Sequence, residues 1–283
     1  MLSILIVNWN TCELLDACLR SIEQAGAAES EIIVVDNAST DGSAKMVREN
    51  HPSVQLIASP TNTGYAKGNN LAFEQATGEL LLTLNPDTEL NDQTLPIAVS
   101  ALRRFPRCGC VSVRLVGTDG KTQRSVRGFP SFLGILGDLL RLRFGAFDAY
   151  RLSRFDYSFE QEAPQPMGTF LLFDRQALDE VGDSRKPFDE GFPIFFNEVD
   201  LLKRLADRGW HCRYVPSASV IHHGGESTKL VRESMIWESH RSLVRYLRKH
   251  SGVAGRLGLN LLLPAIYMAA FIRAKGYHGG FRA

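Results

Sequence analysis

The sequence predicts an α/β fold in which a mostly parallel sheet is flanked by helices. Short apolar runs alternate along the chain with segments whose apolar residues recur at helical spacing. Strands that alternate with helices form βαβ units, and such units build parallel sheets. The 283 residues are 44% hydrophobic and 22% charged, which is typical of a soluble α/β domain with or without an appendage.

The first half of the chain carries the most regular alternation. SILIVNW and EIIVVDN are predicted strands, and between them Leu15, Cys18 and Leu19 fall on one face of a helix. A strand at VQLIASP, a helix through residues 69–75 and a strand at ELLLTLN continue the pattern. The last run is apolar throughout, which is typical of a strand covered on both faces.

The second half is more varied. A helix is expected at residues 95–105, followed by a strand at CVSVRLV and by GTDGKTQRSVRGFP, a polar, Gly-rich stretch that predicts a mobile loop or hairpin. GTFLLFD predicts a buried strand, RQALDEVG a short helix, FFNEVDLLKRLADRGW a helix, and CRYVPSASVIHHGG a strand that ends in histidines. Two further helical stretches complete the chain. We therefore predict a domain at 1–228 and a helical tail at 229–283.

The cysteines and the N-terminal residues predict a cytoplasmic protein with free thiols. The five cysteines include no CxxC pair, and MLSILIVNWN lacks the basic start and long apolar stretch of a signal peptide. Cys108 and Cys110 form a lone CxC, which is weak support for a metal site.

Polar residues follow the predicted strands at one edge of the sheet. Asp36, Asn62 and Asp87 lie at or just beyond the carboxyl ends of strands, where ligands bind in open α/β sheets. Asn85, Pro86 and Asp87 directly follow the most hydrophobic strand. They can offer oxygen ligands to a hard cation, or they can simply form a turn, since all three residue types favour turns.

Seven motifs in order resemble the family-two glycosyltransferases, and most of all their bacterial rhamnosyltransferase-like branch. The motifs are VNWN, VVDNASTDGS, NTGYAKGNN, LNPDTEL, DG…QRSVRGFP, FFNEVDLLKR and VIHHGGEST, over roughly residues 1–228. The resemblance implies a GT-A fold and inverting transfer of a sugar from a nucleotide-diphosphate donor to a glycan or lipid-linked acceptor in cell-surface polysaccharide synthesis.

The resemblance also implies a donor site and a divalent cation, Mg²⁺ or Mn²⁺. Asp36 matches the family acid that accepts a hydrogen bond from the nucleobase. The implied donor-binding residues are Val7, Asn8, Asp36, Asn62, Gly64, Lys67, Asn69, Asn85 and Arg127. Asp87 and His222 are the implied metal ligands, with Asn85 where relatives carry the first acid of DxD. The alternatives are that Asp36 and its neighbours cap the next helix and that His222 is an ordinary hydrogen-bonded histidine.

The implied catalytic acids lie in FFNEVDLLKR. Relatives read EDVD, so Asn197 replaces the first acid, Glu198 stands at the position of the family base, and Asp200 is the neighbouring acid. The alternative is a solvated helix start, where the helix dipole favours acids. For the acceptor side, the family's small-residue strand matches Met167, Gly168 and Thr169, while Arg124 and Arg127 lie on a loop that could close over phosphate.

The tail is basic and partly apolar. Eight Lys and Arg follow Glu238 without any Asp or Glu, so the tail carries +8 in a chain of net charge +1. LGLNLLLPAIYMAAFI has 16 residues and contains Pro264, which predicts an interfacial helix rather than a spanning one. We expect a peripheral enzyme at the inner face of an anionic membrane. The alternative is that the tail packs on the catalytic domain or on a second subunit of a homodimer.

Two other classes of function are disfavoured. A nucleic-acid-binding protein would explain the basic tail, but the tail lacks interleaved aromatic residues and the body is acidic. A non-catalytic regulator that binds nucleotide sugars would keep Asp36 and Asp87 but would need no base, and Glu198 and Asp200 argue against it.

Overall fold

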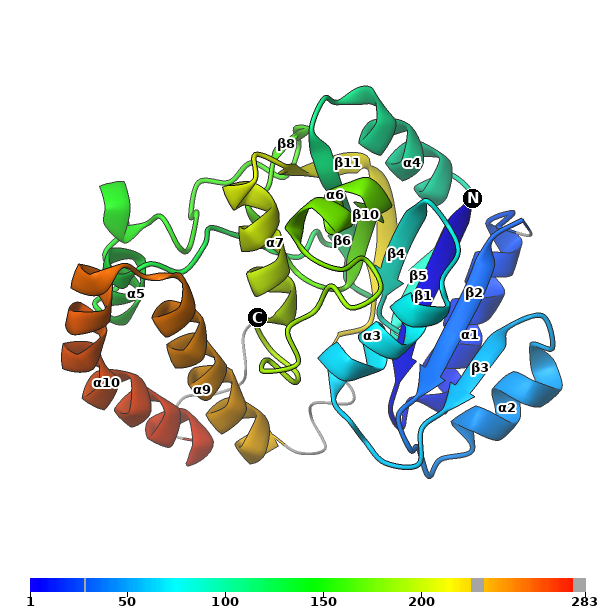
Figure 1. The fold of residues 1–283 in the computed structure, drawn as a ribbon, viewed down its shortest axis with the longest axis horizontal. Helices are drawn as coiled ribbons and strands as arrows, with labels where there is room; N and C mark the ends of the chain where they lie inside the picture. The colour runs from blue at the N-terminus through cyan, green and yellow to red at the C-terminus, as the bar shows by residue number, and fades with distance from the viewer. Residues whose placement is uncertain (28, 225–231, 277–283) are drawn as a thin grey trace.

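The computed structural model describes residues 1–27, 29–224 and 232–276 and confirms the predicted α/β fold (Figure 1). A mixed, mostly parallel sheet runs in the order β3-β2-β1-β4-β10-β6-β11-β5, and β8 adds to β11. The strands are β1 (Leu2–Asn8), β2 (Glu31–Asp36), β3 (Gln55–Ala58), β4 (Leu80–Leu84), β5 (Thr88–Leu90), β6 (Cys108–Val116), β8 (Gln161–Glu162), β10 (Phe170–Asp174) and β11 (His211–His222).

Helices cover both faces of the sheet. The helices of the main body are α1 (Cys12–Gln24), α2 (Ser43–Asn50), α3 (Tyr65–Gln75), α4 (Thr94–Arg104), α6 (Arg175–Val181) and α7 (Asn197–Asp207). α1 and α4 pack on one face together with Ile4 and Leu82, whereas α3, α6 and α7 pack on the other with Leu5 and Leu81. Side chains of a strand alternate between its two faces, and both faces of β4 are covered by helices. Every residue of β4 is therefore buried, as its apolar run predicts.

The pairing of β10 creates the switch in strand direction. β1 pairs in parallel with β2 and β4, but β10 lies antiparallel between β4 and β6. β11 then pairs in parallel with β6 and antiparallel with β5. The carboxyl ends of β1, β2 and β4 consequently lie at one edge of the sheet. The short strand β5 follows β4 in the sequence after a turn of three residues.

The polar stretch after β6 is more ordered than a loop. Val116 forms an isolated bridge with Thr122, and β7 (Val126–Arg127) pairs with β9 (Gln165–Pro166) in a separate two-stranded sheet. Between them lie α5 (Phe132–Leu139) and the short 3₁₀ helix η1 (Gly145–Phe147), neither of which the sequence patterns predicted.

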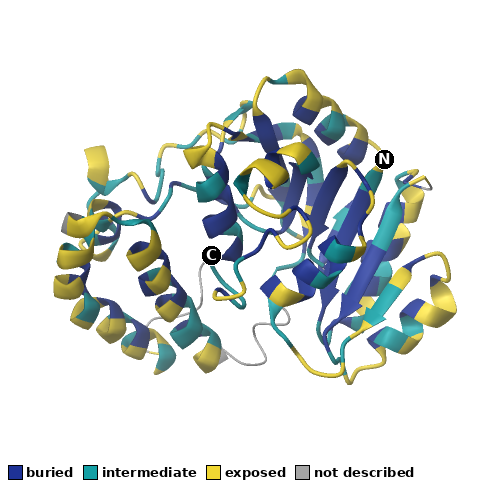
Figure 2. Cartoon of the chain, viewed as in Figure 1, coloured by how far each residue is buried: buried dark blue, intermediate teal, exposed yellow. Residues whose placement is uncertain are grey.

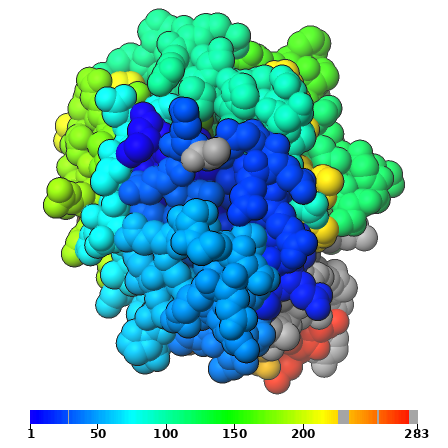
Figure 3. Space-filling view, turned by 90° about the vertical axis from the view of Figure 1, so that its right-hand side faces the viewer, coloured from blue at the N-terminus to red at the C-terminus, as the bar shows by residue number. Residues whose placement is uncertain are grey.

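The tail forms a pair of helices, α9 (Arg232–His250) and α10 (Val253–Ala274), on the side of the molecule opposite β3 (Figure 1). The view from the β3 side is accordingly filled by the N-terminal part of the chain, with only an edge of the tail visible (Figure 3). Tyr246 and Leu259 of the tail share a core with Ile135 of α5 and Val199 of α7. The tail therefore packs on the rest of the chain.

Helix α10 differs from its prediction in two ways. It continues through Pro264, where an interruption was expected. Its apolar segment, Gly255–Ala274, has 20 residues and is long and apolar enough to cross a membrane by length and composition alone, with 22% of the most apolar part buried. Figure 2 shows the contrast between the buried central sheet and the largely exposed surface of this helix.

Candidate active site

The first part of the site is a polar pair at the ends of β1 and β2. Asn8 and Asp36 are both buried, and Asn8 Nδ2 donates to Asp36 Oδ1 at 3.1 Å. Asp36 Oδ2 accepts from the backbone N–H of Ser39 at 3.0 Å, which shapes the turn after β2. Asp41, rather than Asp36, accepts from Ser43 N at the start of α2. Asp41 therefore contacts the start of α2, whereas Asp36 lies buried at the sheet edge with both carboxylate oxygens in hydrogen bonds.

The glycines of NTGYAKGNN allow close packing within the protein. Gly64 has φ +85°, and a Cβ there would lie 2.8 Å from the Pro193 carbonyl oxygen. A Cβ on Gly68 would lie 2.8 Å from Val7 Cγ1, so Gly68 lets α3 approach β1. Asn62 Oδ1 accepts from Gly64 N at 3.0 Å and fixes the turn into α3. These contacts give both glycines a packing role that the sequence pattern left undefined.

The remaining polar residues of this motif differ in burial. Lys67 is exposed on α3. Asn69 is fully buried, and its Nδ2 donates to Tyr65 O at 2.9 Å. Asn69 Oδ1 is a buried acceptor with no hydrogen-bond partner among the described residues. Lys67 therefore has the freedom to meet a ligand, while Asn69 lies beneath the surface of the site.

A turn after β4 carries Asn85 and Asp87. Asn85 N donates to Thr169 O at 2.9 Å, and the Tyr65 hydroxyl lies 3.1 Å from Asn85 Oδ1 and 3.3 Å from Gly168 O. Asn85, Pro86 and Asp87 do form a turn, and that turn directs two polar side chains toward the strand edge. Sequence reasoning missed Tyr65, although it lies inside a quoted motif.

Asp87 and His222 face each other across β5 and β11. Both are buried, and His222 Nε2 lies 3.6 Å from Asp87 Oδ2. The Gln123 amide donates to His222 O at 3.0 Å, so Gln123 Oε1 accepts from His222 Nδ1 at 2.7 Å. This arrangement leaves a lone pair on Nε2 that faces the carboxylate. Burial lowers the pKa of His222, although the charge of Asp87 partly opposes this shift.

A divalent cation fits this pair of side chains. A carboxylate oxygen and a neutral imidazole nitrogen are both electron-pair donors, and a hydrogen-bonded second ring nitrogen is the usual arrangement of a ligating histidine. Within the described ranges, no group of three or more His, Cys, Asp or Glu side chains could hold a metal. A bound cation would therefore need further ligands, such as phosphate oxygens. His223, the next residue along the chain, instead approaches Glu89, with 2.6 Å between His223 Nε2 and Glu89 Oε1.

Glu198 lies in the first turn of α7, against the strand that was predicted to support the acceptor. A Cβ on Gly168 would lie 3.5 Å from Glu198 Cγ, so the Glu198 side chain lies beside Gly168 where any larger residue would touch it. Burial raises the pKa of Glu198 to about 7, and helix N–H groups and the charge of Arg127 only partly offset this effect. The charge of Glu198 also contributes, after burial, to the raised pKa of Tyr65. Packing, charge and hydrogen bonds thus link Glu198 to Gly168, Tyr65 and Asn85.

Met167 and Thr169 connect this group to its surroundings through their backbones. Met167 N donates to Ser125 O at 2.8 Å, and Thr169 O accepts from Asn85 N. Residues 167–169 therefore join the loop before β7 to the turn after β4, and Gly168 at their centre contacts Glu198.

Asp200 has a different environment from Glu198. It is fully buried, accepts from Arg204 Nε at 2.9 Å and from His250 Nε2 at 2.7 Å, and pairs with Lys249 at 2.7 Å. Burial alone would raise the pKa of Asp200, but the hydrogen bonds from His250 and Lys249 and the charge of Arg204 outweigh it and lower the pKa to about 2. Asp200 was predicted as a catalytic acid beside Glu198, and its contacts in the structure tie α7 to the end of α9.

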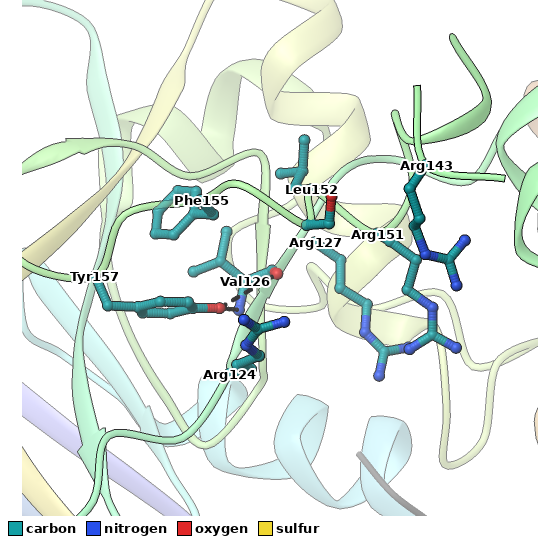
Figure 4. Close-up of a pocket in the computed structure, with 9 residues that line it drawn as sticks. Arg124, Val126, Arg127, Arg143, Arg151, Leu152, Phe155 and Tyr157 are labelled. Carbon is teal, nitrogen blue, oxygen red and sulfur yellow. Dashed lines mark hydrogen bonds between the residues drawn. The ribbon is translucent and has the colours of Figure 1, made fainter. Parts of the chain in front are cut away.

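Arg127 lies close enough to Glu198 for its charge to act on that carboxyl group. Its Nη1 donates to the Tyr150 hydroxyl at 3.2 Å, and it lines a cavity of about 210 Å³ together with Arg124, Arg143 and Arg151 (Figure 4). The cavity is thus lined by four arginines, whereas only Arg124 and Arg127 were named from the sequence. The end of the VIHHGGEST motif, from residue 225, lies outside the described residues.

The chain is similar in sequence to known proteins. Residues 3–182 match the family model described as glycosyl transferase family 2. The chain is 29% identical over 270 residues to an N-acetylglucosaminyl-diphospho-decaprenol L-rhamnosyltransferase of Mycobacterium tuberculosis, covering 89% of this chain and 86% of that protein. It is 28% identical over 220 residues to an O-antigen biosynthesis protein of Myxococcus xanthus, covering 74% of this chain and 16% of that protein.

Solved structures show the same fold. A mannosyltransferase of Pyrobaculum calidifontis, solved with GDP-Man and Mn²⁺, aligns with a TM-score of 0.60 at 20% identity over 96% of this chain and 69% of its own. S. aureus TarS aligns with a TM-score of 0.55 at 17% identity over 97% of this chain and 79% of its own. These similarities confirm the predicted GT-A fold.

Proposed function

The chain belongs to glycosyltransferase family 2, and we propose that it transfers rhamnose, with inversion, from a nucleotide diphosphate to a hydroxyl of a lipid-linked glycan in cell-surface polysaccharide synthesis. Transfer of a sugar follows from the family. The similarity to the mycobacterial rhamnosyltransferase, over most of both chains, supports the choice of sugar and acceptor. The observation that carries the proposal is the placement of Glu198, a carboxyl group with a pKa of about 7, against Gly168 and close to the ends of the central strands.

The donor binds in this proposal along the ends of β1, β2 and β4. Asp36, held by Asn8 and Ser39, accepts a hydrogen bond from the nucleobase. Lys67 is exposed and can meet a phosphate, and Val7 and Asn69 lie beneath the donor. The full proposed donor set is Val7, Asn8, Asp36, Asn62, Gly64, Lys67, Asn69 and Asn85. Arg127 was predicted with this set, and we assign it to the acceptor side instead because it lines the cavity with Arg124, Arg143 and Arg151.

Asp87 and His222 are the proposed protein ligands of Mg²⁺ or Mn²⁺. The facing lone pairs at 3.6 Å support this assignment, because two electron-pair donors repel each other unless a proton or a cation lies between them. When bound, the cation would neutralise negative charge on the departing nucleoside diphosphate. Gln123 keeps His222 in the tautomer that this role requires.

Glu198 is the proposed base. In a single displacement, the acceptor oxygen forms its bond to the anomeric carbon on the face opposite the diphosphate, the bond to the diphosphate breaks, and Glu198 takes the acceptor proton. A pKa of about 7 suits this task, since such a group is ionised in a large fraction of molecules at neutral pH yet holds a proton well. Asp200, with a pKa of about 2, is a weak base, and we assign it a positioning role that holds α7 against α9.

The tail places the enzyme at a membrane in this proposal. Leu257, Leu261, Met268 and Phe271 of α10 are exposed large hydrophobic residues, and Leu261 is 81% exposed. They lie on a tail whose charge is +8, which would attract anionic lipid headgroups. We propose a peripheral enzyme on the cytoplasmic face, where a lipid-linked acceptor would be within reach.

The test is transfer from a panel of nucleotide sugars, with dTDP-rhamnose among them, to a short-chain prenyl diphosphate that carries one sugar. Glycosylated product should form with the rhamnose donor, and the anomeric configuration of the new bond, read by NMR, should be opposite to that of the donor. Binding of nucleotide sugars without transfer to any acceptor would support a non-catalytic regulator instead. Transfer of a different sugar would correct the donor assignment alone.

A further inference from the structure

We propose that Arg124, Arg127, Arg143 and Arg151 form a binding site for the diphosphate of the lipid-linked acceptor. We call this group the arginine pocket. The inference rests on the proposed function and adds the part of the acceptor that is recognised and the residues that recognise it.

The arginine pocket is assembled from one stretch of the chain, residues 124–151, that folds around α5 and η1. Arg127 belongs to β7 and Arg124 precedes it, Arg143 follows α5, and Arg151 follows η1. The lining of the cavity of about 210 Å³ contains four arginines and no acidic residue. Figure 4 shows the four arginine side chains among the residues that line this cavity. A diphosphate occupies only part of such a volume, which leaves room for the groups attached at either end.

The positive charge of the pocket is only partly balanced. Arg151 donates from Nε and Nη2 to Asp138 at 2.5 and 3.1 Å, and Arg143 lies 3.5 Å from the same carboxylate. In the described ranges, no other carboxylate forms an ion pair with any of the four arginines. Asp138 thus fixes Arg151 and leaves an excess of three positive charges. A ligand with two or more negative charges would remove this repulsion, and guanidinium groups suit phosphate because they can bind it in a bidentate manner.

Two diphosphates take part in the proposed reaction, and the position of the pocket favours that of the acceptor. The donor diphosphate must approach Asp87 and His222, at the end of β4. The arginine pocket instead adjoins β7, which pairs with β9, and β9 leads directly into Gly168 and its contact with Glu198. Arg127 is also close enough to Glu198 for its charge to lower the pKa of that carboxyl group. The cations therefore lie next to the base and on the side of the predicted acceptor strand.

An apolar surface lies next to the arginine pocket, around the end of α5. Asp138, which binds Arg151 and Arg143, belongs to α5. Leu139, Leu140 and Phe144, just beyond it, are exposed, and Phe144 is 62% exposed. α5 also packs closely on α10, since a Cβ on Gly258 would lie 2.8 Å from the Phe132 ring.

The order of these features matches the order of groups in one kind of molecule. A base, a cluster of cations and an exposed apolar surface follow one another from Glu198 through the arginine pocket to α5 and α10. A sugar, a diphosphate and a prenyl chain follow one another in the same order in the acceptor named for the mycobacterial relative. A nucleotide-sugar donor has a polar nucleoside where this surface is apolar, so it matches less well.

The kinetic test compares two acceptors that share the sugar and a short alkyl chain but differ in whether a diphosphate links them. The test variant is Arg124→Gln combined with Arg143→Gln, because both side chains are exposed and Arg143 approaches Asp138 only at 3.5 Å, whereas Arg151 binds it through two nitrogens. Loss of two charge-assisted contacts should raise the KM for the diphosphate acceptor by about 30- to 300-fold. The KM for the alkyl glycoside and the KM for the donor should change by less than about threefold. Arg154→Gln, an exposed arginine that does not line the cavity, is the matched control.

A binding measurement keeps the pocket testable if the proposed function fails. Titration calorimetry with a short-chain prenyl diphosphate, without any donor, should show binding to the wild-type protein and to Arg154→Gln, weakened at least about tenfold in the double variant. If the wild type transfers no sugar yet binds the prenyl diphosphate through these arginines, the transfer proposal fails and the pocket stands. Equal binding by all three proteins, equal losses with both acceptors, or a rise confined to the donor KM would each overturn the proposal. The last result would assign the pocket to the donor diphosphate, and inhibition by inorganic pyrophosphate that competes with the donor alone would agree with it.

Discussion

The proposed donor side and the proposed acceptor side of this molecule rest on different parts of the fold. On the donor side, Asn8, Asp36 and Asp87 lie at or directly after the ends of buried strands, and the hydrogen bond from Asn8 to Asp36 joins two neighbouring strand ends. On the acceptor side, Glu198 begins α7 and the arginines of the pocket lie before and after α5. Both helices share a core with α9 and α10. The central sheet thus supports the proposed donor site, whereas the proposed acceptor site depends on helices that pack against the tail.

The largest effect should come from removing the proposed metal ligand of the donor side. Asp87→Ala should reduce transfer by about a thousandfold or more, because the cation supplies several kcal/mol of charge stabilisation to the departing diphosphate. Nucleotide affinity measured by calorimetry should lose its dependence on Mn²⁺, while the unfolding midpoint stays close to that of the wild type. Full activity of Asp87→Ala in the presence of a chelator would contradict this assignment.

Removal of the base should have the next largest effect and should leave the donor side intact. Glu198→Gln should lower kcat by about a hundredfold or more, which is the usual contribution of a positioned base, with an unchanged Kd for the nucleoside diphosphate. Asp207→Asn, an exposed acid on the same helix, serves as the control. If Glu198→Gln stays active while Asp200→Asn is inactive and stably folded, the two acids must exchange roles.

Asp200 should matter for stability more than for chemistry. Asp200→Asn breaks a buried charge network between α7 and α9, which should lower the free energy of unfolding by about 3 kcal/mol in urea denaturation. The pKa of Asp200 is lowered from 3.8 to about 2 in the folded state, so its ionised form contributes stability above about pH 4. That contribution should be lost as the pH falls from 4 toward 2. A variant as stable as the wild type at neutral pH would show that the network does not hold the tail.

The smallest effect concerns the attachment of the tail to a membrane. The full chain should sediment with anionic vesicles at low salt and be released as salt increases, because the exposed arginines attract the headgroups. Replacing Arg256 and Arg273 by Gln should weaken this binding by about thirtyfold, at about 1 kcal/mol per charge. Arg103→Gln, an exposed arginine on α4, is the control. Absence of binding, or a wild-type homodimer that the paired change dissociates, would identify the tail as an assembly element.

The sequence predicts the proposed donor side of the molecule better than the proposed acceptor side. The apolar run of β4 and the acids after β2 and β4 are local signals, so the sheet edge with Asp36 and Asp87 could be recognised from spacing. Tyr65 and Gln123 could not be assigned this way, because their roles arise from contacts with Gly168 and His222, which lie 103 and 99 residues away. The packing roles of Gly64 and Gly68 likewise become visible only when Pro193 and Val7 are placed beside them.

The acceptor side was the least predictable part. α5 and η1 lie in a stretch without clear periodicity, and the position of α5 depends on a core shared with the tail. Arg124 and Arg127 were recognised, but nothing in the sequence brings Arg143 and Arg151 to them, since the ion pair of Arg151 with Asp138 forms only in the folded chain. The continuation of α10 through Pro264 was missed for a related reason: neighbouring packing can stabilise a helix that its local sequence would interrupt.

The pH dependence of kcat/KM tests the role of Glu198 most directly. Burial raises the pKa of Glu198 to about 7, and the base must be ionised to accept a proton, so activity should be lost as the pH falls. The wild type should lose about tenfold in kcat/KM for each pH unit below about 7 and reach a plateau above it. The residual activity of Glu198→Gln should lack this step, while Asp207→Asn should keep it. A step that persists unchanged in Glu198→Gln, or a wild-type profile that stays flat from pH 5 to 8, would show that another group is the base.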